Sequence, residues 1–542
     1  MQKLNIYLLL GLFSLLVFIP GIAKMSVIDR DEAHFAQASR QMLQTGNYFQ
    51  IRFQDITRFQ KPPGINWLQA GSVKLFSNAE ANTIWPYRIP SLLGALLTVW
   101  LTYFLSRQLV SERAARLAAV LLASTLLLVV EAHMAVIDTS LLSSVLLMQC
   151  ALWMIYRDGT ENIKTKLGWA LCFWLAMAYG LVLKGVTPLV GILSILTLCI
   201  IDRRVKWLRN LHIFSGLTLF IGLSLIWVLM VSDAENSNYL IQMIHKDLLP
   251  KLQGGHESHG KPPLFHLLIL PLTFWPASIF LWQGGRYAFL NRHKKAIKFL
   301  LAWILPTWLF FEIMPTKLPQ YVLPTFPAIA LFCALAITES SKDQISGRWF
   351  RLLLILWGIL SIGLAIGLAS LPYLLMQEWT ATAIILFVMI TSCTIAAVYF
   401  AWHGEFQRTS LAVLLMALIS YPLVFGSLLP QLKPLWLTNH IAQLVDKNKI
   451  SNEKPLLVVD FQEPSLVFNL NTHTVQFTDS KTAESLMRDD PSRLALVDES
   501  ALNSMLSDQR DLPVLARLEG FNYSKGRWLT LFLVGQNASG AN

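Results

Sequence analysis

Charged residues are scarce in this chain: they make up only 14% of its 542 residues, whereas 54% are hydrophobic. Ordinary soluble domains carry about a quarter charged residues. Apolar runs of about 17–25 residues recur along most of the chain, and each is long enough to cross about 30 Å of hydrocarbon. The composition therefore excludes an ordinary soluble protein and favours an integral membrane protein.

Cysteine is also rare, and its placement excludes two further classes. The chain contains no CxxC pair, and each of its 5 cysteines lies within or beside an apolar run, so neither a disulfide framework nor a thiolate zinc site is indicated. The C-terminal region has no GxGxxG, no P-loop and no metal-spaced His/Cys cluster. The cysteines are Cys150, Cys172, Cys199, Cys333 and Cys393.

The apolar runs predict an all-α polytopic membrane protein with about thirteen transmembrane helices. The first run is interpreted as a retained helix, because no small-x-small cleavage site follows it. The predicted spans are 6–23, 88–106, 117–131, 139–156, 168–184, 186–201, 212–231, 265–283, 299–313, 321–338, 351–372, 380–402 and 409–428.

Basic residues concentrate in alternate loops, which predicts the orientation. Six of these loops together hold 19 Lys and Arg: 107–116, 157–167, 202–211, 284–298, 339–351 and 403–408. The positive-inside rule places them, and the N-terminus, in the cytoplasm. The C-terminus is then outside, which means the periplasm for a bacterial inner membrane. The net charge of +11 is explained by topology and by attraction to anionic membrane lipids, so nucleic-acid binding is not indicated.

The hydrophobicity falls after residue 428, which divides the chain into a membrane domain over 1–428 and a periplasmic domain over 429–542. Short apolar runs there alternate with helix-like polar stretches, so a small α/β domain with an accessory role is predicted. The membrane domain includes two long external loops, 24–87 and 232–264. The first of these has helical periodicity over 31–44 and 63–76, and it could roof a cavity at the membrane boundary.

Carboxylates in these external segments are candidate catalytic groups. Asp31 and Glu32 follow the first span at the level of the lipid headgroups, where a carboxylate can act as general base. They also suit the first turn of a helix, where the helix dipole favours negative charge. Asp138, in the short link before the fourth span, is a second candidate acid, and as a local feature it also suits a helix N-cap.

Three lysines at the predicted external surface complement the acids: Lys61, Lys184 and Lys317. Several ammonium groups converging on a phosphodiester would stabilise the charge that develops as the phosphate leaves. Each of them could instead extend from a helix end to the membrane surface.

The loop 232–264 contains His256, Glu257 and His259 among glycines. These are acceptable metal ligands, so a divalent metal stays open, but a mobile lid or a substrate-contacting loop is the favoured interpretation. No other cofactor is predicted. His34 and His133 are interpreted as polar contacts.

The motifs resemble those of the lipid-dependent GT-C glycosyltransferases, in particular the bacterial branch that transfers aminoarabinose or galacturonic acid to lipid A. Protein O-mannosyltransferases are more distant relatives. The resemblance covers residues 28–330 and rests on Arg30-Asp31-Glu32-Ala-His-Phe-Ala, Gln60-Lys61-Pro-Pro-Gly64 with Trp67, Leu183-Lys184-Gly185 and Lys317-Leu-Pro-Gln-Tyr321-Val-Leu-Pro324.

The resemblance implies transfer of a sugar from a polyprenyl-phosphate carrier to lipid A or lipopolysaccharide, another glycan or a protein, by inverting displacement. It implies that Asp31 and Asp138 are catalytic acids and that Lys61 binds the donor. Further substrate contacts are expected from Glu32, Lys184, Lys317, Tyr321, His256 and His259. The family's Glu-Lys-Pro motif has Gln60 in place of Glu here, so the sugar is not assigned.

Two other classes stay open. A transporter or lipid flippase would use the same charges to line a translocation path, but it should place ionisable groups near the membrane midplane. A non-catalytic envelope scaffold would need no amphipathic external loop with matching lysines.

Overall fold

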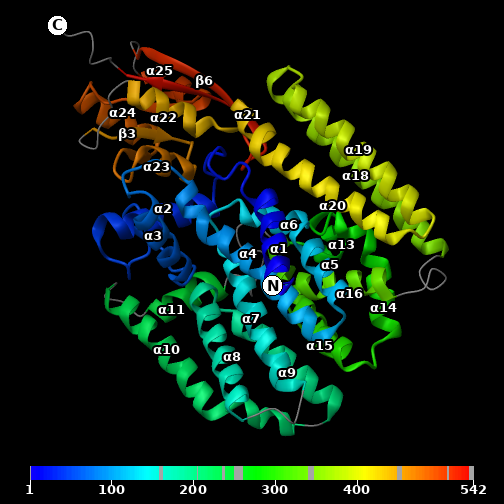
Figure 1. Ribbon diagram of the computed structural model, residues 1–542. Helices are drawn as coiled ribbons and strands as arrows, with labels where there is room; N and C mark the ends of the chain where they lie inside the picture. The colour runs from blue at the N-terminus through cyan, green and yellow to red at the C-terminus, as the bar shows by residue number, and fades with distance from the viewer. Residues whose placement is uncertain are drawn as a thin grey trace.

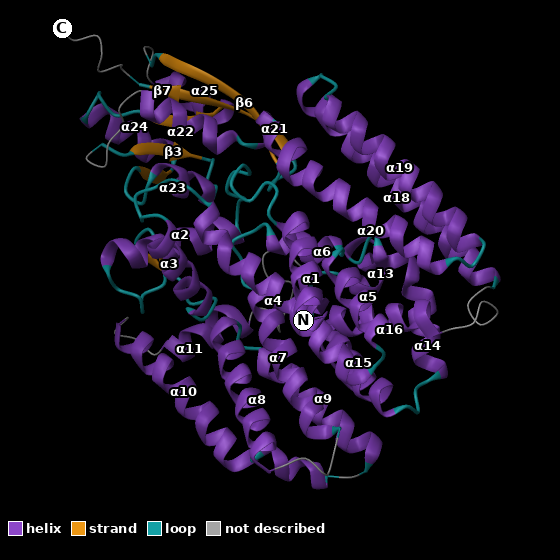
Figure 2. Cartoon of the chain, viewed as in Figure 1, coloured by secondary structure: helices purple, strands orange, loops and turns teal. Residues whose placement is uncertain are grey.

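The chain folds into a bundle of long helices with a small α/β unit at one end, as a computed structural model shows (Figures 1 and 2). The structure describes residues 2–157, 163–203, 205–234, 239–249, 260–339, 347–447, 454–508 and 512–535. The C-terminal strands lie beyond α2 and α3 of the first external loop, at the upper end of the view. The predicted combination of a membrane bundle and a C-terminal α/β region is confirmed.

Nine helices of the described residues are long and apolar enough to span a membrane, or up to eleven if each of two bent pairs is one span. Two shorter apolar helices accompany them. The chain is thus a multi-pass membrane protein, and the number of thirteen spans stays a prediction. The bundle consists of α1 (Gln2–Phe18), α4 (Trp85–Leu109), α5 (Glu112–Ala123), α6 (Leu126–Ala132), α7 (Asp138–Tyr156), α8 (Ile163–Leu183), α9 (Thr187–Asp202), α10 (Ile213–Ala234), α13 (Phe265–Thr273), α14 (Leu281–Leu290), α15 (Lys295–Ile313), α16 (Phe326–Glu339), α18 (Arg348–Met376), α19 (Ala381–Trp402), α20 (Phe406–Leu423) and α21 (Leu429–Gln431).

Two of the predicted spans are broken rather than continuous. The pair α5 and α6 bends by 60°, and α13 bends by 116° against the helical turns Ala277–Leu290 that follow it. The two breaks lie together: Leu126 N–H donates to the Trp275 carbonyl at 2.7 Å, and the buried Tyr421 hydroxyl bonds the carbonyls of Ser124 (2.9 Å) and Trp275 (3.1 Å). Each break thereby satisfies backbone groups of the other, as a membrane interior requires.

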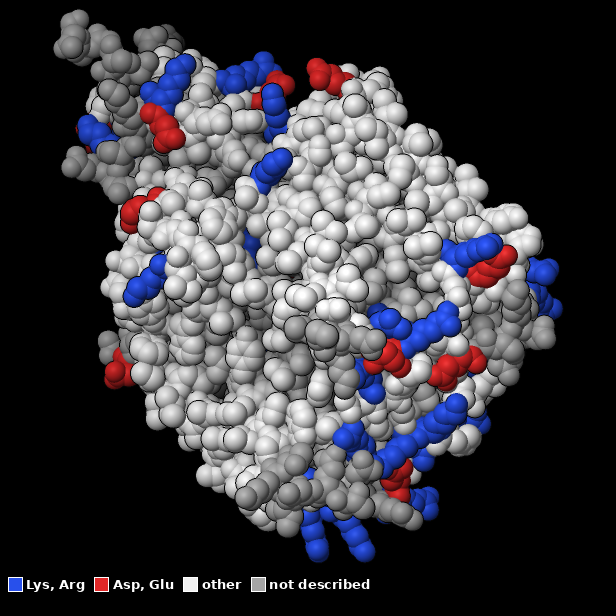
Figure 3. All heavy atoms as spheres, in the orientation of Figure 1, with Lys and Arg blue, Asp and Glu red and all other residues white. Residues whose placement is uncertain are grey.

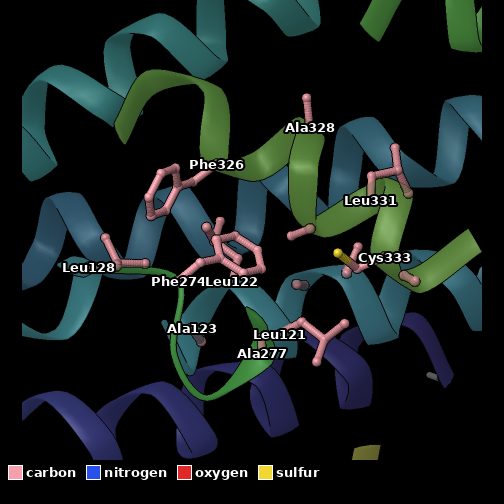
Figure 4. Close-up of a cluster of buried hydrophobic side chains, with 14 of the residues drawn as sticks. Leu121, Leu122, Ala123, Leu128, Phe274, Ala277, Phe326, Ala328, Leu331 and Cys333 are labelled. Atoms are coloured by element: carbon pink, nitrogen blue, oxygen red, sulfur yellow. The ribbon is translucent and has the colours of Figure 1, made fainter. Parts of the chain in front are cut away.

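Apolar side chains from both broken pairs and from α16 pack around these bends (Figure 4). Phe274 and Phe326 are fully buried with ring centroids 5.2 Å apart, and Leu121, Leu122 and Cys333 lie beside them. Sequence hydropathy predicted unbroken spans over 117–131 and 265–283, because it records apolar length and not the direction of the chain.

Burial separates central helices from peripheral ones. The most apolar window of α7 is 94% buried, whereas those of α10, α19 and α18 are only 11%, 28% and 33% buried. Figure 3 shows a broad surface without Lys, Arg, Asp or Glu, with the charged side chains gathered towards its edges. An apolar belt of this kind is stable in lipid and not in water.

The loop 24–87 forms two helices, as the sequence predicts for 31–44 and 63–76. These are α2 (Asp31–Thr45) and α3 (Gly64–Phe76), joined through a short hairpin of β1 (Arg52–Phe53) and β2 (Ile56–Thr57). Later in the chain, α11 (Tyr239–Met243) and the helical turn Ile244–Leu248 lie in the loop 232–264.

The C-terminal domain is a three-layer α/β unit. Its sheet has the strand order β4-β3-β5-β7-β6, with β3 parallel to β4 and β5 and the β7 pairs antiparallel. Leu456 and Val458 face the layer of α22 and α23, whereas Leu457 and Val459 face α24 and α25, as strand alternation requires. The elements are α22 (Leu437–Lys447), β3 (Leu456–Val459), α23 (Pro464–Leu470), β4 (Val475–Thr478), α24 (Ser480–Asp489), β5 (Ala495–Asp498), α25 (Glu499–Asp508), β6 (Val514–Asn522) and β7 (Arg527–Val534).

Candidate active site at one end of the bundle

Lys184, in the turn between α8 and α9, is the centre of the candidate site. Its ammonium lies 3.1 Å from Asp138 Oδ1 and 4.7 Å from the centre of the Tyr321 ring. Burial alone would lower the pKa of Lys184, but Asp138 and Tyr321 outweigh burial and raise that pKa above its ordinary value. The sequence predicted these three residues separately, and the fold brings them together as one charged cluster.

Two further acids belong to this cluster. Glu131, at the end of α6, is 4% exposed and interacts electrostatically with Asp138, Lys184 and Asp31. Asp31 begins α2 and is exposed. Asp138 is the first residue of α7 and makes no side-chain cap, so the N-cap interpretation is wrong: its carboxylate pairs with Lys184 instead.

An apolar cavity of about 240 Å³ adjoins the cluster. Lys184 and Tyr321 line it, and so do Gln60 and Lys61, so two of the predicted lysines meet at one cavity. The rest of the wall is mainly apolar and includes Pro62, Val186, Met243, Phe310, Phe311 and Met314. A ligand with a charged head and a hydrocarbon tail suits such a wall.

The position of Lys61 follows from close packing of the loop before α3. A Cβ on Gly64 would lie 2.6 Å from the Val182 carbonyl, so only glycine allows this loop to approach the end of α8. The Tyr239 hydroxyl donates to the Lys61 carbonyl at 2.6 Å and fixes the loop from α11. Lys61 and Lys184 therefore line the same cavity although they are far apart in sequence.

The sequence analysis predicted that Glu32 contacts a substrate, but the structure places its carboxylate inside the protein. It is 1% exposed and forms a two-pronged ion pair with Arg88 (2.8 and 2.9 Å). Its oxygens also accept from the backbone N–H groups of Ile28 (2.7 Å) and Ala135 (2.7 Å). Because both oxygens are occupied, Glu32 has no oxygen left for a substrate and is corrected to a positioning residue that ties α2 to α4 and to the turn before α7.

The Lys317 ammonium also forms hydrogen bonds within the protein. It is 4% exposed, and its ammonium donates to the carbonyls of Met314 (2.7 Å) and Lys261 (3.1 Å). Two N–H groups of this ammonium thus hold two segments of the chain together, and the predicted substrate contact of Lys317 stays a prediction. Its neighbour Thr316 lines the cavity.

The predicted contacts of His256 and His259 lie outside the described residues and stay predictions. Within the described part of the chain, no group of three His, Cys, Asp or Glu side chains is placed to hold a metal ion. His34 packs edge-on against Phe53 at 4.8 Å, and burial lowers its pKa to about 3, so it is neutral. His133 contacts the carbonyls of Val129 (2.7 Å) and Pro20 (3.0 Å), which agrees with a polar contact.

The C-terminal domain contacts the segment that carries Asp31. Arg30, directly before this acid, has a backbone φ of +68° and donates to the Ser524 carbonyl at 3.1 Å. Asp29 accepts from the Ser465 N–H at 3.0 Å and its own N–H donates to the Tyr523 hydroxyl at 2.8 Å. These contacts fix the start of α2, and backbone strain of this kind persists only where the surroundings hold it.

The body of α2 is held by the same domain. The fully buried Arg40 donates to the Phe468 carbonyl at 2.6 Å, and Gln37 donates to the Thr472 hydroxyl at 2.7 Å. The predicted accessory role of the domain stays a prediction, and its contacts give that role a physical form: the domain holds α2, and with it Asp31, in place.

The Asp29 contact is expected to depend on pH. Burial is the main cause that raises the pKa of Asp29 from 3.8 to about 6. A pKa raised in the folded state gives stability that is complete below pH 3.8 and is lost as the pH rises through about 6. Raising the pH from 4 to 7 should therefore destabilise the wild-type chain relative to Asp29→Asn by about 2–3 kcal/mol. Thermal unfolding in detergent across this range, with the exposed Asp55→Asn as control, measures the effect; parallel curves for wild type and Asp29→Asn would contradict it.

Sequence reasoning missed several residues that build the site. Arg88 and Glu131 carried a signal, since a charge near the end of an apolar run needs a partner. Glu312, near the end of the predicted span 299–313, carried the same signal; it pairs with the buried His266 at 3.0 Å, and His266 lies 3.1 Å from the Leu318 carbonyl, next to Lys317. Tyr523 was missed as well, because its partner Asp29 lies 494 residues away.

The chain shares the GT-C fold with solved structures of lipid-linked sugar transferases. Residues 60–229 match the family model described as dolichyl-phosphate-mannose-protein mannosyltransferase. A sequence relative from Pseudomonas paraeruginosa, an undecaprenyl phosphate-alpha-4-amino-4-deoxy-L-arabinose arabinosyl transferase, is 29% identical over 378 residues. That match covers 68% of this chain and 66% of the relative, just under two thirds of its length.

Solved structures agree on the fold. ArnT from Cupriavidus metallidurans bound to undecaprenyl phosphate superposes with a TM-score of 0.76 at 19% identity, covering 98% of each chain. The Archaeoglobus fulgidus oligosaccharyltransferase tethered to an acceptor peptide gives 0.54 at 11% identity, covering 99% of this chain and 74% of that one. The chain thus resembles the aminoarabinose transferase branch of the GT-C fold, as its motifs predict.

Proposed function

We propose that this chain is a glycosyltransferase that moves a sugar from a polyprenyl-phosphate donor to an acceptor at the external face of a bacterial inner membrane. The observation that carries the proposal is the position of Lys184. Its ammonium pairs with Asp138 in the acid cluster and also lines the apolar cavity that Lys61 shares. A phosphate-binding cation thus lies at the boundary between acids suited to proton transfer and a wall suited to a hydrocarbon chain.

Donor binding follows from this boundary. The phosphate lies between Lys61 and Lys184, and the first prenyl units lie against Phe310, Phe311 and Met314. Burial of a prenyl chain contributes about 0.8 kcal/mol per CH₂. The lysines also stabilise the phosphate as it departs, which is where the transition state gains negative charge.

The acids act on the acceptor. The exposed Asp31 takes the proton from an acceptor hydroxyl or amine as its oxygen or nitrogen bonds the anomeric carbon. The bond from that carbon to the phosphate oxygen breaks, and polyprenyl phosphate leaves with the electron pair. A single displacement inverts the anomeric centre. Asp138 holds Lys184 in place and, together with Glu131, sets the charge of the site.

Similar proteins support the choice of substrates. Sequence relatives are named for an undecaprenyl-phosphate-linked aminoarabinose donor, and one structural neighbour was solved with undecaprenyl phosphate. We propose an undecaprenyl-phosphate sugar as donor, and lipid A or lipopolysaccharide as acceptor before another glycan or a protein. The N-terminus and the basic loops then lie in the cytoplasm and the C-terminal domain in the periplasm.

The transporter alternative is less well supported. The site's ionisable groups lie at helix ends and in connecting turns: Asp31 begins α2, Asp138 begins α7, and Lys184 follows α8. A translocation path would need such groups near the middle of the spans.

Transfer of a radiolabelled sugar from undecaprenyl phosphate to lipid A tests the proposal. Purified wild-type protein in lipid nanodiscs should form labelled lipid A that accumulates with time, and donors carrying neutral, amino and uronic sugars should be compared. Lack of transfer from every donor, combined with movement of labelled lipid across a vesicle membrane, would refute the enzyme and support transport.

Gln60 is expected to select the sugar. Its Oε1 is buried without a hydrogen-bond partner among the described residues, and the side chain lines the cavity. A neutral amide can bond a sugar hydroxyl, whereas a carboxylate there would attract an ammonium group. Gln60→Glu should therefore raise the ratio of kcat/KM for an amino sugar donor over a neutral one by about tenfold or more. Gln377→Glu, at an exposed position just after α18, serves as the control; an unchanged ratio for Gln60→Glu would exclude Gln60 from sugar recognition.

A further inference from the structure

A second and larger cavity lies at the opposite end of the bundle from the candidate active site. It has a volume of about 800 Å³ and is lined by residues from α7, α8, α9 and α15 and from the helical turn Lys206–Leu211. Each of these four helices runs from one site to the other. Lys166 near the start of α8 and Lys184 after its end are separated by about 27 Å at 1.5 Å per residue. The two sites thus lie near opposite surfaces of the membrane.

The lining of this cavity is basic. Lys166, Lys206, Lys295 and Lys298 face it together with His293, against a single acid, Asp202. That acid is already engaged by the Tyr156 hydroxyl and by Lys298 at 3.5 Å. The cavity therefore has an excess of positive charge that the described residues do not neutralise.

Lys166 gives the strongest indication of a ligand. It is only 6% exposed, it lines the cavity, and no hydrogen bond or ion pair joins its ammonium to another described residue. Its ammonium faces the cavity and has no partner of opposite charge among the described residues. An anion in the cavity would provide that partner.

The surroundings indicate that the anion belongs to a lipid. Apolar side chains next to the cavity point away from the protein: Ile200 is 75% exposed, Val205 is 57% exposed and Phe214 is 90% exposed. Ile201 and Trp207 line the cavity itself, and aromatic residues are typical of the level of the lipid headgroups. A headgroup inside the cavity would place its acyl chains along the exposed faces of α9 and α10.

Figure 3 supports this placement. Lys and Arg side chains gather along the lower right edge of the molecule, away from the C-terminal domain, and the surface between is almost free of charge. This charged edge, where some Asp and Glu lie among the Lys and Arg, marks one membrane surface. The cavity lies at the end of the bundle where α8 and α15 begin. Basic pockets between transmembrane helices are known to bind anionic headgroups.

We infer that this cavity is a binding site for the phosphate headgroup of an anionic glycerophospholipid, at the membrane surface opposite to the candidate active site. The volume of about 800 Å³ is of the size that holds a small ligand. Lys166 and Lys206 contact the phosphate, and Lys295 and Lys298 hold the edge of the site, where Lys295 donates to the Arg157 carbonyl at 2.5 Å. The inference does not depend on the proposed sugar transfer.

Native mass spectrometry of the purified full-length chain tests the inference. The chain is released from micelles that contain phosphatidylglycerol and phosphatidylcholine with the same acyl chains. The wild-type chain should retain one more phosphatidylglycerol than the double variant Lys166→Gln/Lys206→Gln, whose affinity for this lipid should fall about tenfold or more. Phosphatidylcholine should be retained equally by both.

A matched control removes two charges from the same membrane surface outside the cavity. Arg292→Gln/Lys294→Gln changes exposed residues and should retain phosphatidylglycerol as the wild type does. If Lys166→Gln prevents folding, the exposed Lys206→Gln alone supplies the comparison. Thermal unfolding gives a second measurement: phosphatidylglycerol should stabilise the wild type and the control but not the cavity variant.

Two outcomes would overturn the inference. Equal retention of phosphatidylglycerol by the wild type and the cavity variants would show that the lipid does not bind in the cavity. Stabilisation of the wild type by inorganic phosphate in phosphatidylcholine nanodiscs, as large as that by phosphatidylglycerol, would show a site for a soluble anion instead.

Discussion

Asp31→Asn is expected to lower sugar transfer by about 10²–10⁴-fold without loss of stability. Asp31 is exposed at the first turn of α2, so its carboxylate is open to an acceptor, and an amide of the same shape cannot take up a proton. Initial rates at equal protein concentration measure the loss, and thermal unfolding confirms the fold.

Asp55→Asn is the matched control for this prediction. Asp55 is an exposed acid in the same external loop, in the hairpin turn between β1 and β2, and its replacement should leave transfer unchanged. A variant Asp31→Asn that retains wild-type rates would remove Asp31 from the mechanism and leave Glu131 as the candidate base.

Lys184→Met should strongly lower the rate of transfer and also destabilise the protein. The Lys184 and Asp138 side chains are 13% and 10% exposed, so the substitution leaves Asp138 buried without its counter-charge. Breaking a buried pair in this way costs about 3–5 kcal/mol. Loss of the phosphate-binding ammonium should lower kcat by about 10²–10³-fold. Thermal unfolding and transfer rates measure the two effects separately.

A second substitution separates these roles of Lys184. Lys184→Met combined with Asp138→Asn removes both charges and should recover most of the stability but none of the transfer. Lys74→Met, at an exposed position of α3, should change neither quantity. Recovery of transfer in the double variant would mean that Lys184 acts only by neutralising Asp138.

The candidate active site shows which residues a local sequence pattern can predict and which it cannot. The helices of the first loop follow from periodicity, and Asp31, Lys61, Asp138 and Lys184 follow from their motifs. Glu32 has the same local signal as Asp31, its neighbour, yet it points inward to Arg88, 56 residues away. No local pattern distinguishes the two acids, because the partner that decides between them is distant in sequence.

The local sequence also does not show which lysines line the cavity. Lys61, Lys184 and Lys317 each stand at an external turn, but only the first two line the cavity, whereas Lys317 is occupied by two carbonyls. Lys166 carried no motif at all, and its burial beside a basic cavity became visible only when α7, α8, α9 and α15 were packed together.

The sequence by itself determined that the chain enters a membrane, where most of its apolar helices lie, that a small α/β region follows them, and which segments carry the motifs. These features depend on apolar length, periodicity and loop charge, each of which is a property of a short stretch of sequence. Only the tertiary structure decided which spans are broken, which acid meets Lys184, how the C-terminal domain holds α2, and where uncompensated positive charge remains. Those outcomes depend on contacts between residues far apart in sequence, and the free energy of such a contact is set by burial and geometry that exist only in the folded chain.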